Sequence, residues 1–137
     1  MSRFFRFYPL SILTVAAIVF LSLFNPSKMG LNHIDIWDKT VHCIMYAAVT
    51  IVFWFEFLIN NNRLTILKVL LFMILLPVLL GGILELLQQY CTPYRSGDWN
   101  DFLADIAGVA MGAVAGLLVE RPLIRHLLSA TGRKDAL

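Results

Sequence analysis

The sequence predicts an all-α integral membrane protein, a four-helix bundle with cytoplasmic N- and C-termini. Hydrophobic residues make up 59% of the 137 residues and charged residues only 15%, whereas soluble domains carry about 25% charged residues. Four apolar segments approach the roughly 20 residues that a helix needs to cross a bilayer. We expect a single domain over residues 1–137, with residues 120–137 as a basic cytoplasmic tail. The four expected spans cover residues 7–24, 40–59, 66–90 and 102–119.

The first two segments differ in how they begin. Residues 7–24 follow Arg3 and Arg6, as the apolar core of a signal peptide would. No cleavage site of the small-x-small type follows, so we expect a retained first span. The second segment is preceded by polar residues and contains one acidic residue, Glu56, which we expect to reach the cytoplasmic interface.

Proline and glycine residues shape the last two segments. Pro77 lies near the middle of the third segment, where it removes a backbone hydrogen bond and should bend the helix. The pair Gly81–Gly82 follows and favours a bend or a close helix approach. In the fourth segment Gly108, Gly112 and Gly116 line one helix face, on which another helix can pack closely. The sequence leaves open whether this face packs within one chain or also supports a homo-oligomer.

The basic residues predict the orientation. With four spans, the side that holds both termini and the middle loop carries eight Lys and Arg residues, and the other side carries three. Loops rich in Lys and Arg stay in the cytoplasm, so we expect cytoplasmic termini in a bacterial inner membrane. Six of the nine acidic residues fall toward the opposite, extracytoplasmic end. No basic stripe with interleaved aromatic residues is present, which argues against a nucleic-acid partner.

Polar residues at helical spacing gather at the extracytoplasmic end. Residues three or four positions apart share a helix face, and charged side chains facing lipid are unfavourable, so we expect these faces to point into the bundle. The predicted ligand-binding residues are Asp38, Lys39, His42, Tyr46, Glu85, Gln88, Arg95, Asp101 and Asp105. Within this set, the candidates for catalysis are His42, Glu85, Asp101 and Asp105.

Several polar residues at this end also have a structural interpretation. Asp98 precedes the fourth segment and is a typical N-cap, the role that we favour for it. Tyr46 and Trp99 fit an interfacial aromatic belt, and His42 fits a hydrogen-bonded structural residue. Glu85 is harder to explain in this way, because its neighbours are apolar. A carboxylate there must be neutral or compensated by a cation.

The compensating cation for Glu85 is Arg95, Lys39 or a metal ion. Carboxylates at this end offer the oxygen ligands that a magnesium-type divalent cation prefers. Cys43 and Cys91 fall near the same end, and the sequence leaves a disulfide between them open. Their spacing does not indicate a zinc site.

Together these residues resemble the VanZ-like family of bacterial membrane proteins. Tyr94 stands where the family commonly has glycine, and Asp105 stands where many members have asparagine. The resemblance covers about residues 35–117 and implies a four-helix integral membrane protein with a polar site at its outer end. The family is named for an accessory protein associated with teicoplanin resistance, which does not by itself make this chain a resistance protein. The matching residues are Asp38-Lys39, His42, Tyr46, Glu85-x-x-Gln88, Arg95, Asp101, Asp105, Gly108 and Gly112.

Three functions fit the predicted site. The one that we favour is a module that binds a lipid headgroup, a cell-wall precursor or a glycopeptide-type ligand, with Arg95 and Lys39 paired to anionic groups. The second is a metal-assisted hydrolase or transferase for a lipid-linked phosphate or glycan, with His42 as general base. The third is a purely structural role in which buried ion pairs fix the helix register.

Overall fold

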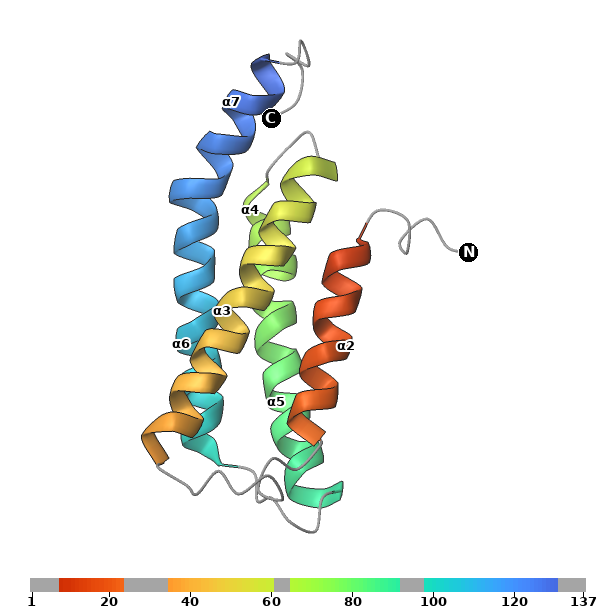
Figure 1. Cartoon of the computed structure of the whole chain (residues 1–137), viewed down its shortest axis with the longest axis vertical. Coiled ribbons are helices and arrows are strands. Elements are labelled where there is room, and N and C mark those ends of the chain that lie inside the picture. The colour runs from red at the N-terminus through yellow and green to blue at the C-terminus, as the bar shows by residue number, and fades with distance from the viewer. Residues whose placement is uncertain (1–7, 24–34, 61–64, 92–97, 131–137) are drawn as a thin grey trace.

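The computed structural model describes residues 8–23, 35–60, 65–91 and 98–130, with residues 35–38 described by their backbone alone. Within these ranges the chain is helical and contains no strand. Four helical rods run alternately up and down, so rods that are neighbours in the sequence are antiparallel (Figure 1). The predicted all-α, four-helix architecture is confirmed.

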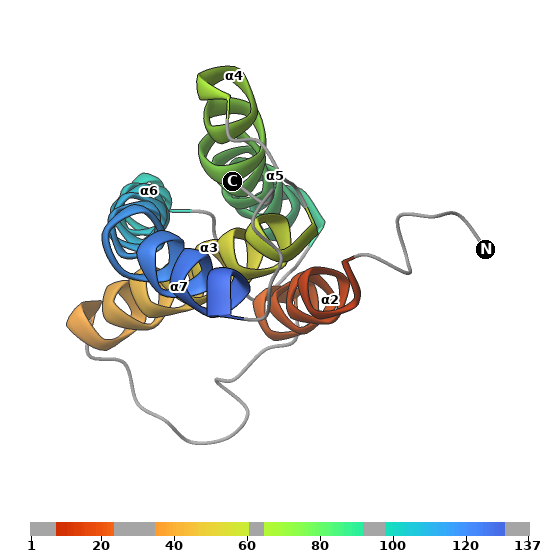
Figure 2. The ribbon, with the colours of Figure 1, turned by 90° about the horizontal axis from the view of Figure 1, so that it is seen from above.

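The rods are bounded as follows. The first is α2 (Pro9–Leu23) and the second is α3 (Asp35–Asn60). The third comprises α4 (Ile66–Lys68), the π-helix η2 (Val69–Leu75) and α5 (Leu76–Cys91). The fourth comprises α6 (Trp99–Ala115), the π-helix η3 (Gly116–Glu120) and α7 (Arg121–Ala130). The second rod contacts each of the other three, and the view along the bundle shows α3 between α2 and α6 (Figure 2).

Three rods are long and apolar enough to cross a membrane, namely Lys39–Asn60, Ile66–Cys91 and Trp99–Ala130. The first rod, α2, is apolar but has 15 residues, fewer than the roughly 20 that cross a bilayer. The fourth rod continues as a helix past the predicted end of the span at residue 119, to Ala130, while the end of the membrane-spanning part stays a prediction. Residues 121–130 of the expected tail therefore extend the last helix, since their apolar side chains recur at helical spacing and Ile124 packs in the core.

Each of the two π-helical segments lies just before a proline. The first, η2, ends two residues before Pro77, and η3 ends two residues before Pro122. Proline lacks the N–H group, and its ring clashes with the carbonyl group four residues earlier in a regular α-helix. A wider turn changes the hydrogen-bond partners there and lets the helix continue. The irregularity predicted at Pro77 is therefore a π-helical segment on its N-terminal side.

The glycine face of the fourth rod packs against α3. A Cβ atom at Gly108 would lie 2.2 Å from the carbonyl oxygen of Cys43, and one at Gly112 would lie 2.7 Å from another carbonyl oxygen of α3. At Gly116 it would lie 2.4 Å from the ring of Trp54. The glycines therefore allow a close helix approach inside one chain. Because α3 covers this face, a homo-oligomer would have to use another surface.

Glu56 anchors the first rod. Its carboxylate accepts hydrogen bonds from the backbone N–H groups of Leu10 (2.7 Å) and Ser11 (2.8 Å) and from the Ser11 hydroxyl (2.6 Å). Donors in the first turn of a helix have no partner inside that helix, and the positive end of the helix dipole favours an anion. Glu56 is therefore buried against α2, and its position relative to the cytoplasmic interface stays a prediction.

Candidate functional site

Four residues of the predicted site are buried together at one end of the bundle. His42 comes from the start of α3, Glu85 from the second half of α5, and Asp101 and Asp105 from the first half of α6. At this end α3 and α6 begin and α2 and α5 finish (Figure 1). The predicted inward orientation is confirmed for all four side chains, which we call the His–acid cluster.

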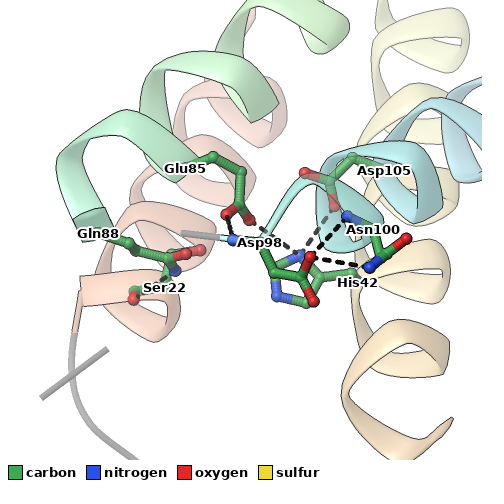
Figure 3. Close-up of polar contacts among 7 residues, drawn as sticks. All are labelled: Ser22, His42, Glu85, Gln88, Asp98, Asn100 and Asp105. Atoms are coloured by element: carbon green, nitrogen blue, oxygen red, sulfur yellow. Dashed lines mark hydrogen bonds and ion pairs between the residues drawn. The ribbon is translucent and has the colours of Figure 1, made fainter. Parts of the chain in front are cut away.

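His42 is held between two carboxylates. Its Nδ1 atom lies 2.9 Å from Oδ1 of Asp105 and 3.9 Å from Oε1 of Glu85 (Figure 3). An ionised carboxylate only accepts hydrogen bonds, so Nδ1 carries the proton in the shorter contact. An imidazole oriented by a carboxylate is the arrangement in which histidine acts as a base or binds a metal ion.

The start of α6 fixes the position of Glu85. The backbone N–H of Asp98 donates to Oε2 of Glu85 at 3.0 Å, and the Asp98 side chain caps α6 by accepting from the backbone N–H of Asn100 at 2.9 Å. The N-cap interpretation of Asp98 is confirmed. Asn100 also donates from its side chain to Asp98 at 3.0 Å, a contact that sequence reasoning missed. One residue thus caps the helix and binds the cluster (Figure 3).

Three members of the cluster are placed so that they could share one cation. His42, Glu85 and Asp101 each offer a ligand atom, and these atoms lie within 4.8 Å of one another. The three residues belong to α3, α5 and α6, so helix packing brings them together. In the described part of the chain this is the only group of its kind.

Gly81 makes room for the cluster, although it was not a predicted site residue. A Cβ atom there would lie 2.9 Å from Oδ2 of Asp105 and 3.4 Å from the ring of Tyr46. The sequence signal was the pair Gly81–Gly82, which indicates a close approach without naming the partner. The structure identifies that partner as the Asp105 side chain.

Tyr46 and Gln88 were predicted to bind ligand, and both are buried beside the cluster. Tyr46 packs in the apolar core, so it does not belong to an exposed aromatic belt, whereas Trp99 is 77% exposed. The Gln88 side chain donates from Nε2 to the backbone carbonyl of Ser22 at 2.8 Å and points toward α2 (Figure 3). This bond ties the end of α2 to α5. Contact of either residue with a ligand stays a prediction.

Among the described residues, no Lys or Arg forms an ion pair with the cluster. Arg95 and the side chain of Asp38 lie outside the described residues. Lys39 is half-buried and forms no ion pair with any residue that the structure describes. The two cysteines, Cys43 and Cys91, are both free, so no disulfide joins them.

A groove of about 330 Å³ lies between α5 and α6. Three polar residues, Glu85, Gln89 and Asp98, line it together with apolar side chains. Glu85 therefore belongs both to the groove wall and to the His–acid cluster. The aromatic rings of Trp99 and Phe102 in this wall meet edge to face, with their centroids 6.2 Å apart. The apolar wall includes Gly82, Ile83, Leu86, Trp99 and Phe102.

Comparison with protein-family models, with curated proteins and with solved structures found no match. The resemblance to the VanZ-like family therefore rests on the sequence motifs alone. The case for a function rests on the side chains of the cluster and the groove.

Proposed function

We propose that this chain is an integral membrane protein that binds a lipid-linked ligand, with the polar headgroup at the His–acid cluster and the lipid chain in the groove between α5 and α6. The observation that carries the proposal is the double position of Glu85, which lines the groove and faces His42. Pockets that bind small molecules are mostly apolar, with a few converging polar groups that fix the orientation. A headgroup with hydroxyl or amine donors would find buried carboxylate acceptors here.

The proposal includes a VanZ-like membrane topology in the bacterial inner membrane. Eight Lys and Arg residues on the side of both termini and three on the other side support cytoplasmic termini. The cluster then lies toward the extracytoplasmic side, within reach of lipid-linked cell-envelope precursors. In this topology the groove opens toward the lipid, because many large apolar side chains of α5 and α6 are exposed.

Filling the groove tests the proposal. A Cβ atom at Gly82 would have only the ring of Phe102 nearby, at 3.4 Å, so a Gly82→Leu side chain would occupy the groove without forcing helices apart. We expect wild-type protein to retain a lipid during purification in mild detergent and the Gly82→Leu variant to retain at least tenfold less, as measured by mass spectrometry of lipid extracts.

The matched control for this test is Ala110→Leu, which adds a leucine to an exposed position of α6 away from the groove. It should retain lipid as the wild type does. Equal lipid content in the wild type and in Gly82→Leu would contradict the assignment of the groove.

A metal-assisted hydrolase or transferase for a lipid-linked phosphate or glycan is the second candidate function. The observation that favours it is the contact of 2.9 Å between His42 and Asp105, since a carboxylate can orient an imidazole for proton transfer. Incubation of wild type and His42→Ala in vesicles of native lipid extract separates the two functions. A lipid consumed only by the wild type would establish the enzyme, and retention without conversion would support the binding protein.

A further inference from the structure

We infer that His42, Glu85 and Asp101 form a binding site for one divalent transition-metal ion, Mn²⁺ or Zn²⁺, that presents a positive charge to a phosphate group of the ligand. The inference deepens the proposed function and rests on it for the identity of the ligand. Carboxylates alone repel phosphate, whereas a bound cation is the largest local charge and reverses that preference. From the bound cation we therefore infer that the headgroup of the ligand contains a phosphate group.

The geometry of the three ligands supports this assignment. Their ligand atoms lie within 4.8 Å of one another, and ligands bound at about 2.1 Å from one ion lie about 3 Å apart. Torsions at the ends of the Glu85 and Asp101 side chains can close this difference, while the backbone of each helix stays in place. Because the three residues belong to different helices, the site forms only in the assembled bundle.

Glu85 supplies a second, independent indication of a ligand. The residue is only 9% exposed, and Oε2 accepts the hydrogen bond from Asp98. Oε1 accepts no hydrogen bond from any described residue, and its ion pair with His42 is 3.9 Å long. This oxygen is not among the fully buried side-chain atoms without a partner, and Glu85 lines the groove, so a ligand can reach it. A cation in the space between Oε1 and the imidazole would satisfy this oxygen.

Neighbouring groups position the three ligands before a metal ion binds. Asp105 fixes the imidazole of His42 so that Nδ1 faces the carboxylates (Figure 3). A metal ion on Nδ1 would take the place of the proton that this atom shares with Asp105. The backbone N–H of Asp98 holds the Glu85 carboxylate from the other side.

The histidine decides the kind of metal. Magnesium prefers oxygen ligands and releases its water reluctantly, whereas an imidazole nitrogen favours transition metals. One nitrogen and two carboxylates therefore favour Mn²⁺ or Zn²⁺ over the magnesium-type ion that the carboxylates alone suggest. The preference for Mn²⁺ over Mg²⁺ should be at least tenfold and should depend on His42.

The test uses purified full-length protein in detergent, stripped with a chelator and titrated with Mn²⁺ alone while electron paramagnetic resonance measures the free ion. We expect one ion per wild-type chain, with a nitrogen hyperfine coupling from the imidazole. Glu85→Gln and Asp101→Asn should each weaken binding at least tenfold. His42→Ala should lose the nitrogen coupling and the preference for Mn²⁺ over Mg²⁺.

Glu56→Gln is the matched control, since it makes the same chemical change at a buried glutamate whose oxygens already have donors. It should leave Mn²⁺ affinity unchanged. If Glu85→Gln and Asp101→Asn elute as folded protein and bind Mn²⁺ as tightly as wild type, the metal site is wrong. Lipid content measured on the same samples separates the two proposals. Lipid retained without Mn²⁺ binding overturns the metal site alone, and Mn²⁺ binding without lipid overturns the proposed function alone.

Discussion

Glu56 and Glu85 are two buried glutamates in different parts of the bundle, and their oxygens have very different partners. Glu56 is 5% exposed and Glu85 is 9% exposed. Glu56 accepts three hydrogen bonds of 2.6–2.8 Å from α2. Among the described residues, Glu85 accepts one hydrogen bond of 3.0 Å and faces His42 at 3.9 Å. Burial alone therefore does not distinguish a structural carboxylate from a candidate ligand, whereas the completeness of its hydrogen bonding does.

The same contrast holds for the surroundings of the two residues. Glu56 meets the first turn of a helix, where the backbone donors and the helix dipole both favour a carboxylate. Glu85 lies near His42 and near Asp101 and Asp105, two carboxyl groups that add negative charge to the same small volume when ionised. The Glu56 contact stabilises the fold, while the Glu85 cluster is a place that gains from a bound cation.

The strongest test of this comparison is Glu56→Gln. The amide keeps one acceptor oxygen but turns its NH₂ group toward donors, and a lost hydrogen bond to a charged group costs about 2–3 kcal/mol. We expect the free energy of unfolding to fall by about that amount in detergent, as measured by circular dichroism during denaturant titration. Lipid content and Mn²⁺ affinity of the folded fraction should not change. A stability equal to that of the wild type would mean that α2 does not depend on this cap.

A smaller effect is expected at Asp98, which caps α6 with its side chain and binds Glu85 with its backbone N–H. Asp98→Ala removes the side-chain cap of α6 and should lower the free energy of unfolding by about 1 kcal/mol. The backbone N–H that binds Glu85 is kept while one polar side chain of the groove wall is shortened, so lipid retention should fall by less than in Gly82→Leu. Asp98→Asn, which can still cap the helix, should restore most of the stability. A large loss of lipid in Asp98→Ala with intact stability would instead make this side chain part of the binding site.

Helical spacing was enough to predict which polar residues face the interior of the bundle. His42, Glu85, Asp101 and Asp105 were each placed on an inward face from the spacing of polar residues in apolar segments, and all four are buried. Composition predicted four spans, and among the described residues three helices are long and apolar enough to cross a membrane. These features are local, because a helix face is defined by residues a few positions apart.

The partners of these residues could not be predicted, since they depend on how the rods pack. Glu56 and Glu85 both lie in apolar stretches, and nothing in the sequence says that only one of them meets a helix N-terminus. The pair Gly81–Gly82 indicates a close approach but not its partner. The structure shows that the side chain of Asp105 lies against Gly81. The continuation of the fourth helix to Ala130 was not predicted, because the charged residues after 119 hid its continuing apolar spacing.

The smallest change in stability, and the largest change in binding, is expected for Glu85→Gln. The amide oxygen can still accept the hydrogen bond from Asp98, and the change removes one of the negative charges gathered around His42. Relief of the repulsion between Glu85 and the neighbouring carboxylates offsets the lost contact with His42, so the free energy of unfolding should change by less than about 1 kcal/mol. Lipid content should fall at least tenfold under the conditions used for Gly82→Leu. Because Glu56→Gln makes the same chemical change with the opposite outcome, the pair separates structure from function within one chain. If Glu85→Gln loses as much stability as Glu56→Gln and keeps its lipid, then both glutamates are structural.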